Sequence, residues 1–173
     1  MNAEIIGYTL RRQEWETLRL ALKLADPFGA FEMPLDADAC QAACDALYDL
    51  GVMTPGGDRT IVDGLFAFLI GELADASLAL EGRAEARQFQ LIRTPKMLVL
   101  VERSLTHATV TPLENLAAAQ SLLEPALRHC APPVVIELRG REAVLDSREA
   151  ADPDTARAEL ARMFGSFAAH TVA

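Results

Sequence analysis

Four short apolar runs follow one another in the middle of the chain, with only short polar connections between them. They occupy residues 77–81, 88–93, 97–103 and 106–111. Strands joined by so few residues pair as antiparallel neighbours, because a parallel crossover needs a dozen or more residues. The sequence therefore predicts an antiparallel meander at the centre of the fold.

Helical patterns flank this meander on both sides. Apolar residues recur at helical spacing over residues 9–25, 36–50, 63–74, 111–130 and 152–167. Asp36, Asp63 and Asp152 stand where N-caps are expected, since their carboxylates can accept the first free amides of a helix. The fold class predicted is α+β, with helices packed on an antiparallel sheet.

Residues 111–114 (TPLE) are the clearest helix start in the sequence. Threonine can cap, proline fits the first turn, and glutamate can reach back to the cap amide. Pro125 is expected to kink or split the helix that follows, because proline lacks the amide that an interior turn needs.

Turn signals predict two further hairpins. Residues 54–58 (TPGGD) separate two short apolar segments and predict a hairpin, or wing, between the second and third helices. Residues 133–139 predict another strand with a short partner at 142–146, followed by a polar loop at 147–151. The whole chain, residues 1–173, is interpreted as one domain with an N-terminal helical, wing-bearing section.

The composition narrows the classes of function. The chain is 51% hydrophobic and has a formal net charge of −9, which argues against disorder and opposes binding to a phosphate backbone. Residues 61–80 are apolar but are interrupted by Asp63, Glu72 and Asp75, so they are a poor membrane span. The first residues lack a basic and an apolar signal region. We expect a cytoplasmic protein that binds neither nucleic acid nor membrane.

No catalytic or cofactor motif is recognisable in the sequence. The three histidines, His107, His129 and His170, fall in different predicted elements, and no second member of a catalytic group accompanies any of them. Cys40 and Cys44 share the apolar stripe of a predicted helix and are interpreted as buried thiols rather than metal ligands, because a structural zinc needs four ligands. We therefore expect no enzyme activity, no cofactor and no metal.

The order helix, helix, wing at residues 9–62 also suggests a winged-helix regulator. Its candidate recognition helix, residues 36–50, carries four aspartates and no lysine or arginine, which opposes a position beside DNA phosphates. A small-molecule-binding or enzymatic domain is the other alternative, and a deep polar pocket with two convergent titratable groups would favour it.

The element order resembles that of the EspG-type chaperones of type VII secretion and their shorter relatives in Gram-positive bacteria. The likeness spans roughly residues 9–128. It is carried by residues 9–15 (TLRRQEW), residues 46–52 (ALYDLGV) before the wing, the meander, and the helix start at 111–114. The mycobacterial members are longer. The resemblance implies a cytoplasmic protein that binds another protein and performs no chemistry.

Partner-binding residues are predicted from apolar side chains without an evident cover. Val99 and Val101 point to the opposite face of their strand from Leu98 and Leu100, so both faces of the meander are apolar. We predict that Val99 and Val101, with Phe28 and Phe31 of a loop, contact a protein partner, either a client or a second copy of the chain.

A basic concentration in the meander has two interpretations. It is formed by Arg83, Arg87, Arg93, Lys96 and Arg103. These residues either keep strand edges solvated and free of aggregation, or they form a surface that receives an acidic partner.

Overall fold

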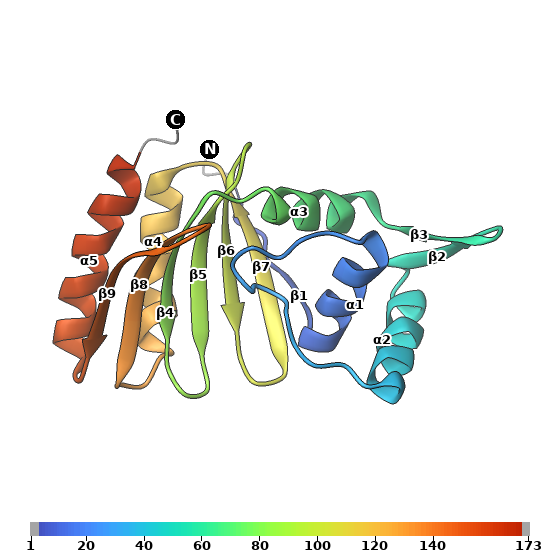
Figure 1. Ribbon diagram of the computed structural model, residues 1–173, viewed down its shortest axis with the longest axis horizontal. Coiled ribbons are helices and arrows are strands. Elements are labelled where there is room, and N and C mark those ends of the chain that lie inside the picture. The colour runs from blue at the N-terminus through green and yellow to red at the C-terminus, as the bar shows by residue number, and fades with distance from the viewer. Residues whose placement is uncertain (1–3, 171–173) are drawn as a thin grey trace.

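The computed structural model describes residues 4–170, and its centre is a seven-stranded antiparallel sheet (Figure 1). The strand order is β1-β7-β6-β5-β4-β8-β9, and a separate hairpin pairs β2 with β3. The elements in chain order are β1 (Tyr8–Arg11), α1 (Arg12–Leu22), α2 (Ala37–Asp49), β2 (Met53–Gly56), β3 (Arg59–Val62), α3 (Gly64–Ala74), β4 (Leu78–Arg83), β5 (Gln88–Arg93), β6 (Leu98–Arg103), β7 (His107–Leu113), α4 (Leu116–Arg128), β8 (Val134–Gly140), β9 (Val144–Ala150) and α5 (Pro153–Ala169). The predicted α+β fold is confirmed, including the meander β4 to β7 and the wing β2–β3.

Three aspartates begin helices as the sequence predicts. The carboxylate of Asp36 accepts the amide of Ala39, and that of Asp152 accepts the amide of Thr155. Asp63 likewise accepts the amide of Leu65. Each carboxylate satisfies an amide that has no partner within its own helix. The local sequence therefore sets where α2, α3 and α5 start.

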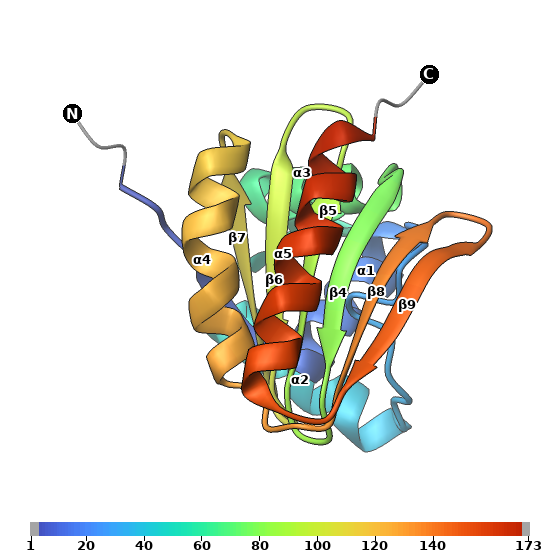
Figure 2. The same cartoon turned by 90° about the vertical axis from the view of Figure 1, so that its left-hand side faces the viewer.

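The chain covers both faces of the central strand β6. Successive side chains of a strand alternate between faces, so Leu98 and Leu100 pack in the core beneath α4 and α5. Val99 and Val101 pack in a second core that includes residues of α1 and α3. Figure 2 shows α4 and α5 in front of the sheet and the N-terminal helices behind it.

Three segments differ from the sequence-based predictions. Residues 8–11 form β1 instead of the first turn of a helix. Residues 111–113 complete β7, and α4 begins after Asn115, whose side chain accepts the amide of Ala118. The predicted loop at 147–151 belongs mostly to β9. Pro125 lies inside α4 without splitting it.

Leu69 of α3 is 1% exposed, which confirms the expectation that it is buried. We expect Leu69→Ala to lower the free energy of unfolding by about 2–5 kcal/mol, through lost apolar burial and the cavity left behind. Leu65→Ala is the matched control, because Leu65 lies on the exposed side of the same helix and should change stability by less than about 0.5 kcal/mol. Urea denaturation measures both, and equal effects would contradict the assignment.

Candidate partner-binding surfaces

The four residues predicted to bind a partner are all buried within the chain. Val99 and Val101 are 0% and 1% exposed, and Phe28 and Phe31 lie in the same core. Phe31 stacks on Trp15 of α1, with ring centroids 5.1 Å apart. The prediction is therefore wrong in placing these side chains on the surface, because the chain itself supplies the cover that their sheet face needs.

Hydrogen bonds to a single carboxylate stabilise the loop that carries these two phenylalanines. The Asp26 side chain accepts the amides of Ala30, Phe31 and Glu32 at 2.8–2.9 Å. These bonds close the loop on itself, as aspartate side chains commonly do in turns. Phe28 and Phe31 are thereby directed into the core beside α1.

A groove of about 650 Å³ lies between this loop and strands β4, β5, β6 and β8 of the sheet. It is lined on the loop side by Phe28, Gly29, Glu32, Met33 and Pro34, with Glu16, and on the sheet side by Arg83, Gln88, Arg103 and Arg139. Its cations and carboxylates largely compensate one another: Arg83 pairs with Glu137, and Glu16 with Arg19. The groove is therefore polar and close to neutral.

A buried polar cluster lies beside this groove. Glu81 of β4 is fully buried and receives hydrogen bonds from Gln90 Nε2 at 2.8 Å and Arg139 Nη1 at 3.2 Å. Gln90 also donates to the carbonyl oxygen of Phe28 at 2.7 Å. The cluster joins three neighbouring strands to the loop and compensates a charge that would be costly to bury alone.

The basic residues of the meander separate into two groups at opposite ends of the sheet. Arg93 donates to the carbonyl oxygens of Phe167 and His170 at the end of α5, and Lys96 lies 5.5 Å from the ring centre of Phe68. Arg83, Arg87 and Arg103 lie at the other end, and Gln88 pairs across strands with both Arg83 and Arg103. The pairing of β1 with β7 adds Arg11 and Arg12 to this second group, beside His107.

Exposed apolar side chains concentrate in the wing-bearing section, residues 37–74. Five large ones are Tyr48, Leu50, Ile61, Leu65 and Phe68. Leu50 and Ile61 are 61% and 54% exposed. The Tyr48 hydroxyl bonds that of Thr60 at 2.8 Å, which ties α2 to the wing. Figure 1 shows the wing projecting from this section, away from the sheet.

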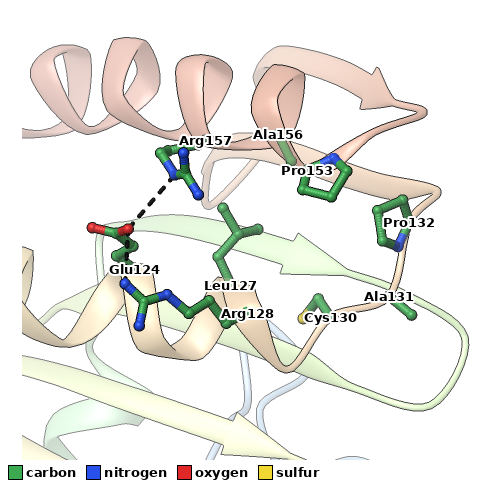
Figure 3. Close-up of a pocket in the computed structure, with 9 residues that line it drawn as sticks. All are labelled: Glu124, Leu127, Arg128, Cys130, Ala131, Pro132, Pro153, Ala156 and Arg157. Atoms are coloured by element: carbon green, nitrogen blue, oxygen red, sulfur yellow. Dashed lines mark hydrogen bonds and ion pairs between the residues drawn. The ribbon is translucent and has the colours of Figure 1, made fainter.

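A small hollow of about 190 Å³ lies between the ends of α4 and α5 (Figure 3). Its apolar lining is Leu127, Cys130, Ala131, Pro132, Pro153 and Ala156. Glu124 on its rim is paired with Arg128 at 3.0 Å and Arg157 at 3.6 Å. Burial raises the pKa of the Cys130 thiol to about 11, so it stays protonated at neutral pH and is a poor nucleophile.

The two remaining cysteines differ from the prediction. Cys40 and Cys44 of α2 are half-buried rather than buried. Burial raises the pKa of the Cys44 thiol, and the neighbouring Cys40 contributes to the rise. Across residues 4–170, no group of three or more His, Cys, Asp or Glu side chains is arranged to hold a metal ion. In the same part of the chain, no helix is both long enough and apolar enough to span a membrane.

No protein-family model matches the chain, and no curated protein matches its sequence. Among solved structures, the chain is similar to the Mycobacterium tuberculosis type VII secretion system chaperone EspG5, solved in complex with the PE25–PPE41 dimer. The TM-score is 0.51 at 14% sequence identity, and the match covers 72% of this chain and 52% of that chain. At this identity the likeness shows a shared fold. The chain therefore matches about half of the length of that chaperone.

Sequence reasoning missed the approach of Arg12 to Arg103. The only signal for it was the alternation of Tyr8 and Leu10 with Thr9 and Arg11, which is typical of a strand but too short to outweigh a helical pattern. Residues 8–11 form a strand because they pair with β7, about a hundred positions further along the chain.

Proposed function

We propose that the chain is a non-enzymatic protein-binding domain of the chaperone or adaptor type, and that it serves a secretion substrate. The observation that carries the proposal is the group of exposed apolar side chains on the wing-bearing section. Apolar side chains that gather at a surface are typical of protein-binding sites. Covering one such side chain contributes about 1.5–3 kcal/mol.

Two features support a protein as the occupant. Both faces of the central strand β6 are covered by the chain's own helices, whereas five large exposed apolar side chains lie in the wing-bearing section. Helix α2 within it has aspartates and no lysine or arginine, which suits a polypeptide better than a nucleic acid. The fold likeness to a chaperone solved with a bound protein dimer agrees with this choice.

The proposed compartment is the cytoplasm. All three cysteines are unpaired, which agrees with a reducing environment. The secretion role itself is inferred from the fold likeness.

Site-specific photo-crosslinking in the natural host tests the proposal. A photoreactive phenylalanine derivative is placed at Leu50, Ile61 or Phe68, and Leu145 of β9 is the matched control because it is 50% exposed. We expect the three wing-section positions to give one discrete adduct with the same protein, and Leu145 to give none. The partner is identified by mass spectrometry.

A second variant links the adduct to binding. Leu50→Glu combined with Ile61→Glu should weaken capture of that partner at least about tenfold, since a charge cannot be buried unpaired. Stability should change by less than about 0.5 kcal/mol at such exposed sites. The proposal fails if no discrete adduct forms, or if Leu145 gives the same one. An adduct between two copies of the chain would mean that this surface is a homodimer interface and not a client-binding site.

A further inference from the structure

Two neighbouring hollows are lined by residues of the β4–β5 and β6–β7 turns and of the start of α1. Figure 1 shows both turns at the same end of the sheet. The smaller, of about 80 Å³, is lined by Arg12, Ala84, Glu85, Ala86, Arg87, Gln88, Arg103, Ser104 and Leu105. The larger, of about 310 Å³, is lined by Arg11, Arg12, Gln13, Met33, Leu105, Thr106 and His107. Arg12 belongs to both. We call Arg11, Arg12, Arg87 and Arg103 the arginine surface.

The arginine surface carries unpaired positive charge in an acidic chain. Within residues 4–170, none of its four members has a carboxylate oxygen within 4.0 Å. By contrast, seven other arginines are in ion pairs: Arg19, Arg83, Arg128, Arg139, Arg148, Arg157 and Arg162. The chain as a whole has a formal charge of −9, so this concentration is opposite in sign to the protein that surrounds it.

Arg103 is held in place by neutral groups only. Its Nη1 donates to the carbonyl oxygens of Gly29 at 2.7 Å and Ala30 at 3.2 Å, and its Nη2 donates to Gln88 Oε1. Burial lowers the pKa of Arg103, and the nearby Arg12 lowers it further, while Asp26 and Glu81 act in the opposite direction. The guanidinium is thus fixed in position, and its charge is uncompensated at close range.

Arg12, which lines the same hollow as Arg103, has a side-chain N–H group without a hydrogen-bond acceptor. Its Nε is buried and has no hydrogen-bond partner in the structure. Arg12 is also the first residue of α1, where the helix dipole adds positive potential. The nearest acid on the same helix, Glu14, accepts the Arg11 amide with one carboxylate oxygen. Arg12 and Arg103 line the same hollow, and the two cations repel, which a bound carboxylate would relieve.

We propose that the arginine surface binds an acidic peptide segment of a partner protein, with side-chain carboxylates reaching Arg12 and Arg103. This rests on the proposed function in one respect, that a polypeptide carries the anion. Glu85 at the rim and Glu102, which attracts Arg87, restrict the favourable region to the two hollows.

The size of the basic region favours a short peptide over a nucleic acid. Four arginines serve an anion of a few residues, whereas a duplex would extend past them along a chain whose formal net charge is −9. Repulsion between like charges is screened only beyond about 8–10 Å at physiological salt. Exposed Leu105, at the border of the two hollows, supplies apolar contact for a side chain next to the acids.

Fluorescence anisotropy with a labelled tetraglutamate peptide tests the proposal on the full chain. We expect saturable binding at low ionic strength that weakens as salt is added. Arg11→Ala combined with Arg12→Ala should reduce the affinity at least about tenfold, the usual consequence of losing charge-assisted contacts. Arg59→Ala is the matched control, since Arg59 is an exposed arginine on the wing. It should bind like the parent chain.

Amide chemical shifts locate the peptide. They should move at residues 11–13, 84–88 and 103–107, and not in β9 or α5. If the double variant fails to fold, Arg87→Glu provides the same test from an exposed turn.

Three results would overturn the proposal: no saturable binding with a Kd below about 1 mM, equal binding by the arginine variants, or stronger arginine-dependent binding of short duplex DNA or inorganic phosphate. The two proposals fail separately. If the wing positions give no adduct but the peptide binds, the proposed function alone is wrong. If the wing positions give the adduct but the peptide does not bind, the acidic-peptide site alone is wrong.

Discussion

Replacement of Trp15 by alanine is expected to lower the free energy of unfolding by about 3–5 kcal/mol. Trp15 is fully buried in the core between α1 and the sheet. Its ring lies 5.1 Å from that of Phe31 and 5.5 Å from that of Phe66. Its Nε1 donates to the carbonyl oxygen of Ala108 in β7 at 2.9 Å. The substitution therefore creates a large cavity and removes the side-chain hydrogen bond that ties α1 to β7.

Trp15→Phe separates the two contributions. Phenylalanine keeps most of the ring contacts but loses the bond to Ala108, and one such hydrogen bond contributes about 0.5–1.5 kcal/mol. Urea denaturation followed by circular dichroism measures both variants. An alanine variant that loses less than about 1 kcal/mol would contradict the assignment of Trp15 to the core, because surface substitutions have effects of that size.

Replacement of Arg139 by alanine is expected to cost about 3–5 kcal/mol, since it leaves a buried carboxylate without its cation. Glu81 is fully buried, whereas Arg139 retains about a third of its side-chain exposure, 34%. The unpaired charge would then depend on Gln90 alone for a hydrogen bond. The cost should appear as reduced stability, measured by urea denaturation, without any change in the exposed wing.

The double variant Glu81→Met with Arg139→Met is the control. Removal of both charges is often neutral when apolar groups of similar volume replace them, so most of the lost stability should return. If Arg139→Ala is itself within about 0.5 kcal/mol of the parent chain, the ion pair contributes nothing measurable and the interpretation of this cluster is wrong.

Pro112 shows why a strong local signal was misread. Residues 111–114 have every feature of a helix start, yet residues 111–113 continue β7. Strand β1 pairs with β7 only as far as Val110 opposite Tyr8, so β7 is an edge on that side beyond Val110. A proline at an edge removes no ladder hydrogen bond. Tertiary pairing with β6 therefore outweighed a capping pattern that was locally favourable.

The edge strand β1 and the second half of the edge strand β9 were missed for a related reason. Residues 8–11 alternate over only four positions, and residues 147–150 are mostly polar. Each is a strand because a neighbour is present, β7 for the first and β8 for the second. The charged side chains of β9 are typical of an edge that must not pair with other molecules. In the sequence alone, such polar residues are typical of a loop.

The α+β class, the meander, the wing and the starts of α2, α3 and α5 could all be predicted from the residues alone, because short connections, turn residues and caps act within a few positions. It also indicated that both sides of β6 are apolar. The cover of Val99 and Val101 by α1 and α3, and the position of Arg12 beside Arg103, depend on contacts between segments far apart in the sequence. The hydrophobic pattern shows that Val99 and Val101 need a cover, but it does not assign that cover to particular helices.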